Sequence, residues 1–267
     1  MRIYSLITRS FSLAANSSRT LRVYNVSGIT AYEKALNFQR DKRDFLKYPK
    51  EDTLGLDNLI LVEHNPVYTL GKNSEVKNCL FDLSEENESY QVHKVERGGE
   101  VTYHGPGQIV GYTVIDLKRH KKDLHWFLRQ IEEVVIQVLG TYGIKGSRHD
   151  EYTGVWVGDE KVAAIGLSAS KWITMHGFAL NVSPEMSDFD RIIPCGIDDP
   201  TKSVTSIKEL LSSSPDTPQP QLSQVRENII QTFARQFEYQ KVYYHTELSE
   251  KGSSFGFNIG KKQAKPA

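Results

Sequence analysis

A glycine-rich segment near the middle of the chain, residues 97–108 with the sequence RGGEVTYHGPGQ, has residue types suited to binding a ligand. Its four glycines permit positive φ and close approach of the backbone to a ligand, at a conformational cost that an ordinary strand avoids. Pro106, between two of these glycines, fixes a sharp turn. The segment therefore predicts a binding loop whose main-chain N–H groups and single arginine face a substrate. The alternative is a structural turn in a β-rich domain.

Cys195 is the candidate nucleophile. It lies between a proline and a glycine in the sequence RIIPCGI, residues 191–197. Such irregular backbone favours an accessible thiol over the buried cysteine that is otherwise common. A free thiol is mostly protonated at neutral pH, so a nucleophilic cysteine needs a neighbour that accepts its proton.

Lys161 is the first candidate for that neighbour. It follows a Gly-Asp-Glu turn and precedes the apolar run Val162–Ile165, which indicates a buried strand. Burial would draw the ammonium group into a region of low dielectric constant, where a lysine becomes a usable base. The alternative is a solvated lysine at the edge of a hairpin. His104 and His176 leave a second arrangement open, in which a histidine activates the thiol.

The composition excludes several classes of function. The chain has 33 basic and 33 acidic residues, so no global field attracts it to nucleic acid or anionic lipid. No apolar run is long enough for a membrane span. Neither a Cys-x-x-Cys nor a His-Glu-x-x-His motif occurs, so no metal site is predicted. A chain of 267 residues can bury a core without a disulfide, and we interpret Cys79 as a structural free thiol.

The hydrophobic periodicity predicts the elements that must position these residues. Helices are expected at 31–48, 123–142, 206–211 and 225–239, and strands at 58–70 (interrupted at Pro66), 109–117, 154–157, 161–165 and 173–182. Strands and helices mix without regular β-α-β alternation. The sequence therefore favours the α+β class.

The ends of the chain differ in composition from its middle. The first 32 residues contain no acidic residue but several arginines and serines, which is typical of a mitochondrial targeting leader, assigned to residues 1–30. The alternative is a disordered N-terminal tail that carries no targeting signal. We expect one domain at 31–248, with a polar, proline-rich linker or insertion at 212–224 and a disordered tail at 249–267.

The glycine-rich segment resembles the signature of the lipoyl(octanoyl) transferases. Three further segments match that family in order and spacing: HNPVYTLG at 64–71, KVAAIG at 161–166 with HGFALN at 176–181, and PCGI at 194–197. The resemblance covers residues 55–210. It implies the fold of the lipoate and biotin protein ligases, a mixed β-sheet with flanking helices.

The resemblance also implies roles for individual residues. Cys195 matches the acyl-accepting cysteine, and Lys161 matches the catalytic lysine. His104 and His176 would polarise the thioester carbonyl or orient loops. An octanoyl chain buries about six methylenes, which contributes on the order of 5 kcal/mol. The implied walls of its slot are Arg97, Gly98, Gly99, Glu100, Val101, Thr102, Tyr103, His104, Ala164, Ile165, Gly166, Gly177, Phe178 and Ala179.

The resulting hypothesis is a mitochondrial octanoyltransferase that needs neither cofactor nor ATP. It would take the octanoyl group from octanoyl-acyl carrier protein and pass it to a lysine of lipoyl domains, those of 2-oxoacid dehydrogenase subunits and of the glycine-cleavage H protein. Two rivals stay open: an ATP-dependent lipoate or biotin ligase of the same fold, and a non-catalytic acyl-binding protein. We expect a monomer.

Overall fold

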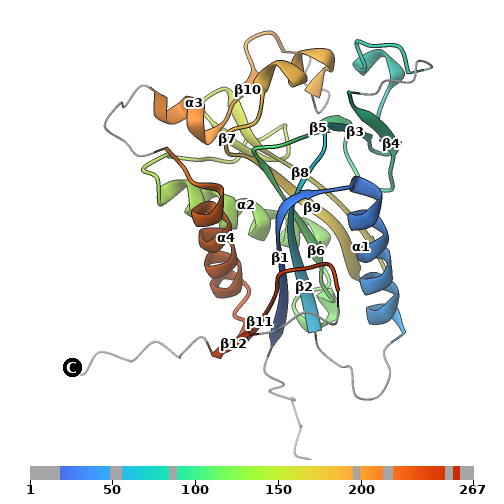
Figure 1. Ribbon diagram of the computed structural model, residues 1–267, viewed down its shortest axis with the longest axis vertical. Helices are drawn as coiled ribbons and strands as arrows, with labels where there is room; N and C mark the ends of the chain where they lie inside the picture. The colour runs from blue at the N-terminus through green and yellow to red at the C-terminus, as the bar shows by residue number, and fades with distance from the viewer. Residues whose placement is uncertain are drawn as a thin grey trace, which may run out of the picture.

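A large mixed β-sheet divides the molecule into two layers of helices (Figure 1). The computed structural model describes residues 19–48, 56–83, 89–194, 199–212, 219–249 and 255–258. The strands of the sheet follow the order β10 (Ser203–Val204), β8 (Glu160–Ser170), β9 (Ile173–Asn181), β6 (Gln108–Val114), β2 (Leu56–His64), β1 (Thr20–Thr30), β11 (Lys241–His245) and β12 (Phe255–Asn258), and β7 (Val155–Val157) pairs with β8.

The middle of this sheet is antiparallel and its flanks are partly parallel. Strands β2, β6, β9 and β8 alternate in direction, whereas β1 is parallel to both β2 and β11, and β10 is parallel to β8. The expected α+β class with a mixed sheet and flanking helices is therefore confirmed.

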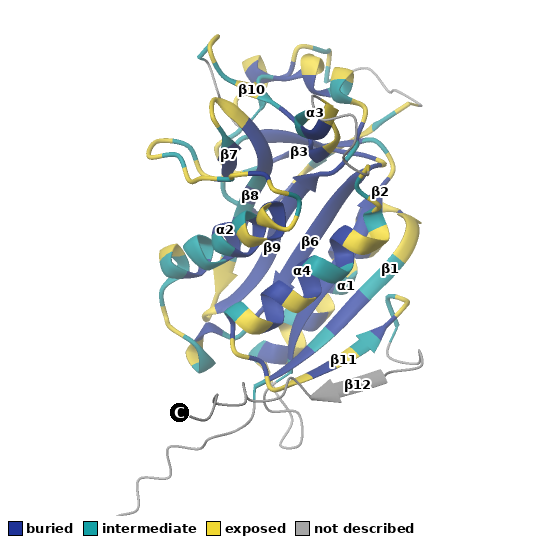
Figure 2. Ribbon diagram, turned by 90° about the vertical axis from the view of Figure 1, so that its left-hand side faces the viewer, coloured by how far each residue is buried: buried dark blue, intermediate teal, exposed yellow. Residues whose placement is uncertain are grey.

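The helices cover the two faces of the sheet unequally. Helix α1 (Tyr32–Lys47) packs on one face, against β2, β6 and β9, and α2 (Leu124–Gly140) and α4 (Leu222–Gln236) pack together on the other (Figure 1). The short helix α3 (Ile207–Ser212) follows β10. Figure 2 shows the buried strands enclosed between these layers.

Helix α2 illustrates how the sequence specifies this packing. Its apolar residues recur at helical spacing, and Phe127, Ile131, Val135 and Val138 are fully buried in the core shared with α4. Asp123 caps the helix by accepting a hydrogen bond from the Trp126 N–H at 2.9 Å, as expected from the sequence.

A second, three-stranded sheet covers the upper end of the large one in Figure 1. Its central strand β3 (Val67–Leu70) is parallel to β4 (Gln91–Lys94) and antiparallel to β5 (Val101–His104). The sequence predicted one interrupted strand at 58–70, but the chain changes sheets after β2, at Asn65-Pro66. A proline cannot donate to a strand ladder, so it marks the point where the pairing ends.

The structure differs from the expected boundaries at both ends of the chain. Residues 20–30, assigned to the leader, form β1 inside the large sheet, where Leu21 and Val23 are fully buried. The rest of the predicted leader, residues 1–18, and residues 213–218 of the predicted linker lie outside the described residues, and α4 already begins within that linker at Leu222. The expected tail contains β12, which pairs with β11. No helix of the described part is long and apolar enough to cross a bilayer.

Candidate active site

A pocket of about 240 Å³ lies on the α1 face of the large sheet, beneath the segment that contains β5. Strands β6, β8 and β9 form its floor, since the register pairs Ala164 with Ala179 and Gly166 with Gly177. Its lining residues are Tyr32, Asn73, Arg97, Gly99, Glu100, Thr102, His104, Val110, Tyr112, Glu151, Tyr152, Thr153, Lys161, Ala164, Ile165, Gly166, His176, Gly177, Phe178 and Ala179.

Lys161 lies at one end of this lining, at the start of β8, and its side chain is buried (4% exposed). The ammonium nitrogen lies 5.5 Å from the centre of the Trp156 ring. Gly154 makes room for the side chain, because a Cβ at that position would lie 2.6 Å from the Lys161 Cε. Among the described residues, no carboxylate lies within 4 Å of the Lys161 Nζ. The ammonium is therefore held against an aromatic ring rather than in an ion pair.

The guanidinium of Arg97 organises the loop that forms the pocket roof. It donates to the carbonyl oxygens of Thr69 (2.6 Å), Glu100 (2.8 Å) and Gly98 (3.1 Å) and to the Thr69 hydroxyl (2.9 Å). Gly98 in turn donates its N–H to the Leu167 carbonyl at 2.9 Å, which ties the loop to β8. Arg97 lines the pocket, and most of the hydrogen bonds that its guanidinium can donate go to its own loop and to Thr69.

Two histidines near the pocket are kept neutral by burial and are oriented by their hydrogen bonds. The Nδ1 of His64 donates to the Thr30 carbonyl at 2.7 Å, and its Nε2 accepts from the Tyr112 hydroxyl at 2.7 Å. The Nδ1 of His104 lies 2.7 Å from the Gln108 amide oxygen. Burial lowers the pKa of His64 to about 4 and that of His104 to about 3. Both rings are therefore uncharged at neutral pH, and each has an orienting partner.

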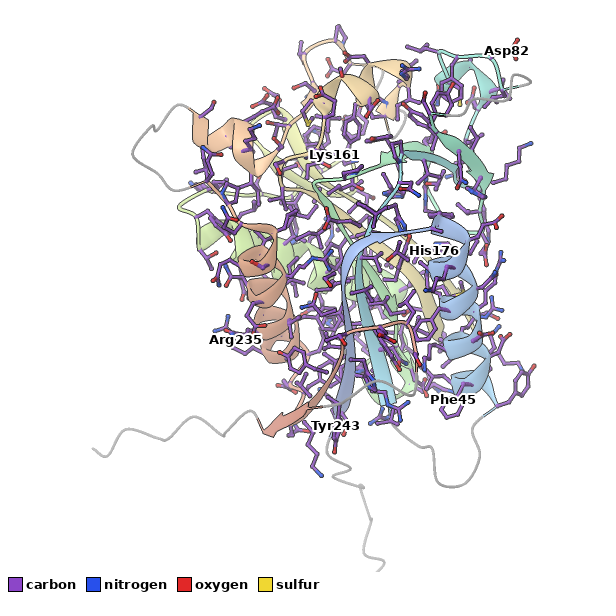
Figure 3. All side chains as sticks on the ribbon, in the orientation of Figure 1. Phe45, Asp82, Lys161, His176, Arg235 and Tyr243 are labelled. Carbon is purple, nitrogen blue, oxygen red and sulfur yellow. The ribbon has the colours of Figure 1, made fainter. Side chains whose placement is uncertain are left out.

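His176 lacks such a partner. Its Nε2 is buried without a hydrogen bond in the described part of the molecule, and the nearest Glu96 carboxylate oxygen is 4.0 Å away. Burial is the largest influence on the ring and lowers its pKa to about 4, so it is also neutral. Figure 3 shows His176 below Lys161 and beside α1.

Cys195 lies outside the described residues, but both chain segments that lead to it are anchored near the pocket. On one side, Ile193 donates its N–H to the Asn78 carbonyl at 2.8 Å. On the other side, β10 pairs Val204 with Lys161, and the Thr205 N–H donates to the Lys161 carbonyl at 2.9 Å.

Most of the predicted binding residues line the pocket, and three do not. Gly98, Val101 and Tyr103 are absent from the lining. Val101 and Tyr103 face the core of the small sheet because side chains alternate along β5, which sends Thr102 and His104 to the pocket instead.

Sequence reasoning missed several lining residues. Tyr32, Val110 and Tyr112 carry no motif, and they reach the pocket only through the packing of α1 and β6. Residues 151–153 enter from the loop before β7. The sequence offered one signal for which side chains face the pocket: the alternation of side chains along the strand that ends at His104.

Comparison with known proteins identifies the family. The model of the lipoyl protein ligase A/B catalytic domain matches residues 32–234. An octanoyltransferase of Nostoc sp. is 47% identical over 221 residues, which cover 82% of this chain and 93% of that protein. The chain belongs to this family, among its octanoyltransferases. The octanoyltransferase of Nostoc punctiforme is 49% identical over 215 residues (80% and 87%), and the chloroplastic octanoyltransferase LIP2p2 of Arabidopsis thaliana is 46% identical over 185 (67% and 64%).

Solved structures show that the fold of this octanoyltransferase family member is similar to that of lipoate-protein ligases. A lipoate-protein ligase A bound with ATP superposes with a TM-score of 0.65 at 13% identity, over 85% of this chain and 87% of that one. A lipoate protein ligase of T. acidophilum with bound lipoic acid gives 0.63 at 13% identity, over 85% and 88%. At such low identity these neighbours establish the common fold alone.

Proposed function

We propose that this chain transfers an octanoyl group from octanoyl-acyl carrier protein to a lysine of lipoyl domains, through a thioester on Cys195. The observation that carries the proposal is the position of Lys161: a buried ammonium group at one end of a pocket floored by small residues. Family membership supports the acyl group and the reaction class.

The reaction proceeds in two balanced steps. In the first, Lys161 acts as the base and accepts the thiol proton of Cys195 while the sulfur attacks the donor thioester carbonyl. The bond to the carrier sulfur breaks, and the proton passes to that departing thiolate. In the second, the ε-amine of the acceptor lysine attacks the Cys195 thioester, an amide forms, and the proton released by the amine returns to the Cys195 sulfur by way of Lys161. The donor thioester is already activated, so no ATP is consumed.

The pocket floor suits an acyl chain. Ala164 and Gly166 on β8 face Ala179 and Gly177 on β9, and none of these side chains fills the space above the sheet. Burial of about six methylenes would stabilise the bound chain by roughly 5 kcal/mol.

The loop above the floor offers groups for the developing oxyanion. Gly99 and Glu100 line the pocket, and their main-chain N–H groups have no acceptor among the described residues. Free N–H groups aimed at a tetrahedral oxygen stabilise the transition state by about 3–4 kcal/mol each. We assign them as the candidate oxyanion donors.

Intact mass spectrometry tests the proposal. Wild-type chain mixed with octanoyl-acyl carrier protein, without ATP, should gain one octanoyl group, which an apo lipoyl domain then removes; Cys195→Ala should gain none. Lys161→Arg keeps the positive charge but removes the base, and should slow transfer by about 10²–10⁴-fold. The exposed Lys145→Arg is the matched control and should leave the rate unchanged.

Other outcomes would assign another function. Modification of the lipoyl domain only when ATP and free octanoate are supplied would make the chain a ligase. An acyl-enzyme that forms equally well on Cys195→Ala would refute the proposed nucleophile. Binding of octanoate without any transfer would leave an acyl-binding protein.

The proposed partners and location follow from the same reaction. The acceptors would be lipoyl domains of 2-oxoacid dehydrogenase subunits and of the glycine-cleavage H protein, and a monomer suffices for the chemistry. The arginine- and serine-rich first residues support delivery to the mitochondrion. Fusion of residues 1–30 to a fluorescent protein tests this address, and because one relative is chloroplastic, accumulation in a plastid would overturn it.

A further inference from the structure

Two polar groups that line the pocket make no hydrogen bond to the described protein. Tyr32 and His176 are each only 2% exposed, and both line the pocket. Within the part of the chain that the structure describes, neither the Tyr32 hydroxyl nor the His176 Nε2 makes a hydrogen bond. The His176 Nε2 is fully buried, and buried polar atoms are nearly always paired, so this nitrogen calls for a ligand or a functional cause. The Tyr32 hydroxyl, which makes no bond to the described protein, is a second polar group of the same pocket lining.

The backbone of His176 is held in place by dedicated side chains. Its φ of 61° lies in the left-handed region, which costs a non-glycine residue free energy in the middle of a strand. Its N–H donates to the Gln39 amide oxygen at 3.0 Å, and its carbonyl accepts from the Thr113 hydroxyl at 3.1 Å. A glycine would adopt this conformation without strain. The presence of a histidine here therefore indicates that the imidazole side chain itself has a role.

Both His176 and Lys161 line the pocket, and Figure 3 shows them well apart, with His176 below Lys161. The strand register describes this separation. Gly166 pairs with Gly177. His176 precedes Gly177 on β9 and pairs with Leu167, so it is one position further from Lys161. Gly166 is five positions after Lys161, a length of about 16 Å along the strand. An extended octanoyl chain is about 9 Å long, with each C–C bond of about 1.5 Å advancing about 1.25 Å. The lysine side chain and the thioester would occupy the rest of the distance between Lys161 and Gly166.

Tyr32 reaches the same pocket from the start of α1. Its ring lies parallel to that of His104, with centroids 6.3 Å apart and an interplanar angle of 11°. Seven residues along the same helix, Gln39 contacts His176. Positions seven apart lie on one face of a helix, so α1 presents both contacts to the pocket.

We propose that the Tyr32 hydroxyl and the His176 Nε2 form a polar stop at the deep end of the acyl slot and thereby set the accepted chain length. This inference rests on the proposed acyl transfer and goes beyond it by naming the residues that determine specificity. The floor of the slot, on β8 and β9, is formed by the small residues Ala164, Gly166, Gly177 and Ala179. A chain of eight carbons ends before them, whereas a longer chain presses methylenes against unpaired polar atoms and displaces any water they hold.

A polar stop and a purely steric stop give different results with a matched pair of donors. The 8-hydroxyoctanoyl and nonanoyl groups have the same number of heavy atoms, but only the first ends in a hydroxyl. A polar stop accepts the hydroxyl, which pairs with Tyr32 and His176, and rejects the methyl. A steric stop rejects both to the same extent.

The experiment measures kcat/KM for octanoyl, 8-hydroxyoctanoyl, nonanoyl and decanoyl groups on acyl carrier protein, with wild type, Tyr32→Phe and His176→Phe. We expect wild type to prefer 8-hydroxyoctanoyl to nonanoyl by about tenfold. Tyr32→Phe, which removes only an oxygen atom, should lower that preference at least fivefold and raise the decanoyl-to-octanoyl ratio. Tyr142→Phe, on the opposite side of the sheet, is the control and should leave both ratios at their wild-type values.

Ratios that stay within twofold of wild type in Tyr32→Phe and His176→Phe would overturn the polar stop. His176→Phe also carries the strain of positive φ, but strain alone changes all donors equally and leaves the ratios intact. If wild type transfers no acyl group, the proposed function fails, and calorimetric binding of the four free acids to the same variants then decides the inference on its own.

Discussion

At the scale of single residues, burial keeps three histidines in and beside the pocket uncharged. His64, His104 and His176 all have depressed pKa values, and desolvation is the largest cause in each case. Neutral imidazoles can donate or accept a hydrogen bond without carrying charge into the pocket. This argues against a histidine as the base for Cys195, since His64 and His104 already have partners and His176 lies well apart from Lys161.

The same pKa values predict how stability depends on pH. A histidine with a pKa of about 4 in the folded state and about 6.5 in the unfolded chain binds more protons when unfolded between these two values. The free energy of unfolding should therefore fall as the pH drops from about 6.5 towards 4, by up to about 1.4 kcal/mol per pH unit for each such histidine. Urea denaturation at pH 7 and pH 5 measures the change, and His64→Gln should reduce the slope. Equal stability at the two pH values would show that the rings are charged in the folded protein.

At the scale of elements, glycines let strands β6 and β9 meet closely under the pocket. A Cβ on Gly177 would collide with the Gly111 carbonyl oxygen, which is backbone and cannot move aside. Gly177 also lines the pocket, next to Phe178. The absence of a side chain therefore determines both the strand packing and the shape of the pocket floor.

Gly177→Ala should consequently destabilise the fold by about 1–3 kcal/mol and slow acyl transfer. Gly140→Ala is the matched control, because a Cβ there meets no atom within 4 Å, and alanine at this helical position should stabilise by roughly 0.5–1 kcal/mol. Chemical denaturation compares the two variants. A Gly177→Ala chain as stable as Gly140→Ala would mean that the strands separate without cost.

The sequence predicted helices and strands well where their hydrophobic periodicity was strong. It predicted them poorly where a segment is a strand only because distant strands pair with it. The apolar residues that recur at helical spacing in the 123–142 segment located α2, and KVAAIG located the first half of β8. Residues 20–30 lack acids and were therefore assigned to a leader, yet their partners β2 and β11 make them an interior strand. Tyr32 likewise joins the pocket only through the placement of α1, a contact between segments that no local pattern encodes.

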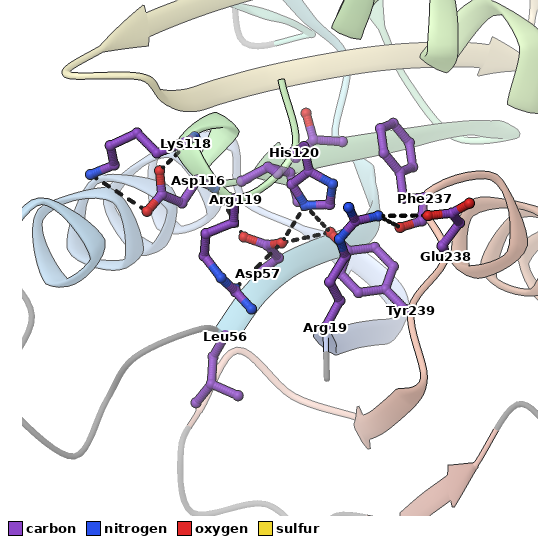
Figure 4. Close-up of polar contacts among 12 residues, drawn as sticks. Arg19, Leu56, Asp57, Asp116, Lys118, Arg119, His120, Phe237, Glu238 and Tyr239 are labelled. Carbon is purple, nitrogen blue, oxygen red and sulfur yellow. Dashed lines mark hydrogen bonds and ion pairs between the residues drawn. The ribbon is translucent and has the colours of Figure 1, made fainter. Parts of the chain in front are cut away.

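At the scale of the whole molecule, the pocket and a buried charge network lie at opposite ends of the sheet. The network centres on the Asp57 carboxylate, which is fully buried at the start of β2 (Figure 4). It accepts from the Asp116 N–H at 2.9 Å and the Tyr239 hydroxyl at 2.8 Å, and it lies 2.8 Å from the His120 Nε2. These contacts join β2, the segment after β6 and the segment after α4. His64, at the pocket end of β2, is seven residues away, about 23 Å along the strand.

This separation predicts that stability and activity can be changed independently. Tyr239→Phe removes one hydrogen bond to a buried carboxylate and should lower the free energy of unfolding by about 1.5–3 kcal/mol. The rate of acyl transfer should remain at its wild-type value, because the two other bonds to Asp57 still hold β2 in register. Tyr243→Phe, on the neighbouring β11 and 38% exposed, is the matched control and should change the unfolding free energy by less than about 0.5 kcal/mol. Thermal and urea unfolding with parallel transfer assays measure both quantities. A loss of transfer in Tyr239→Phe at temperatures where the chain is fully folded would show that the network acts on the pocket through the length of the sheet.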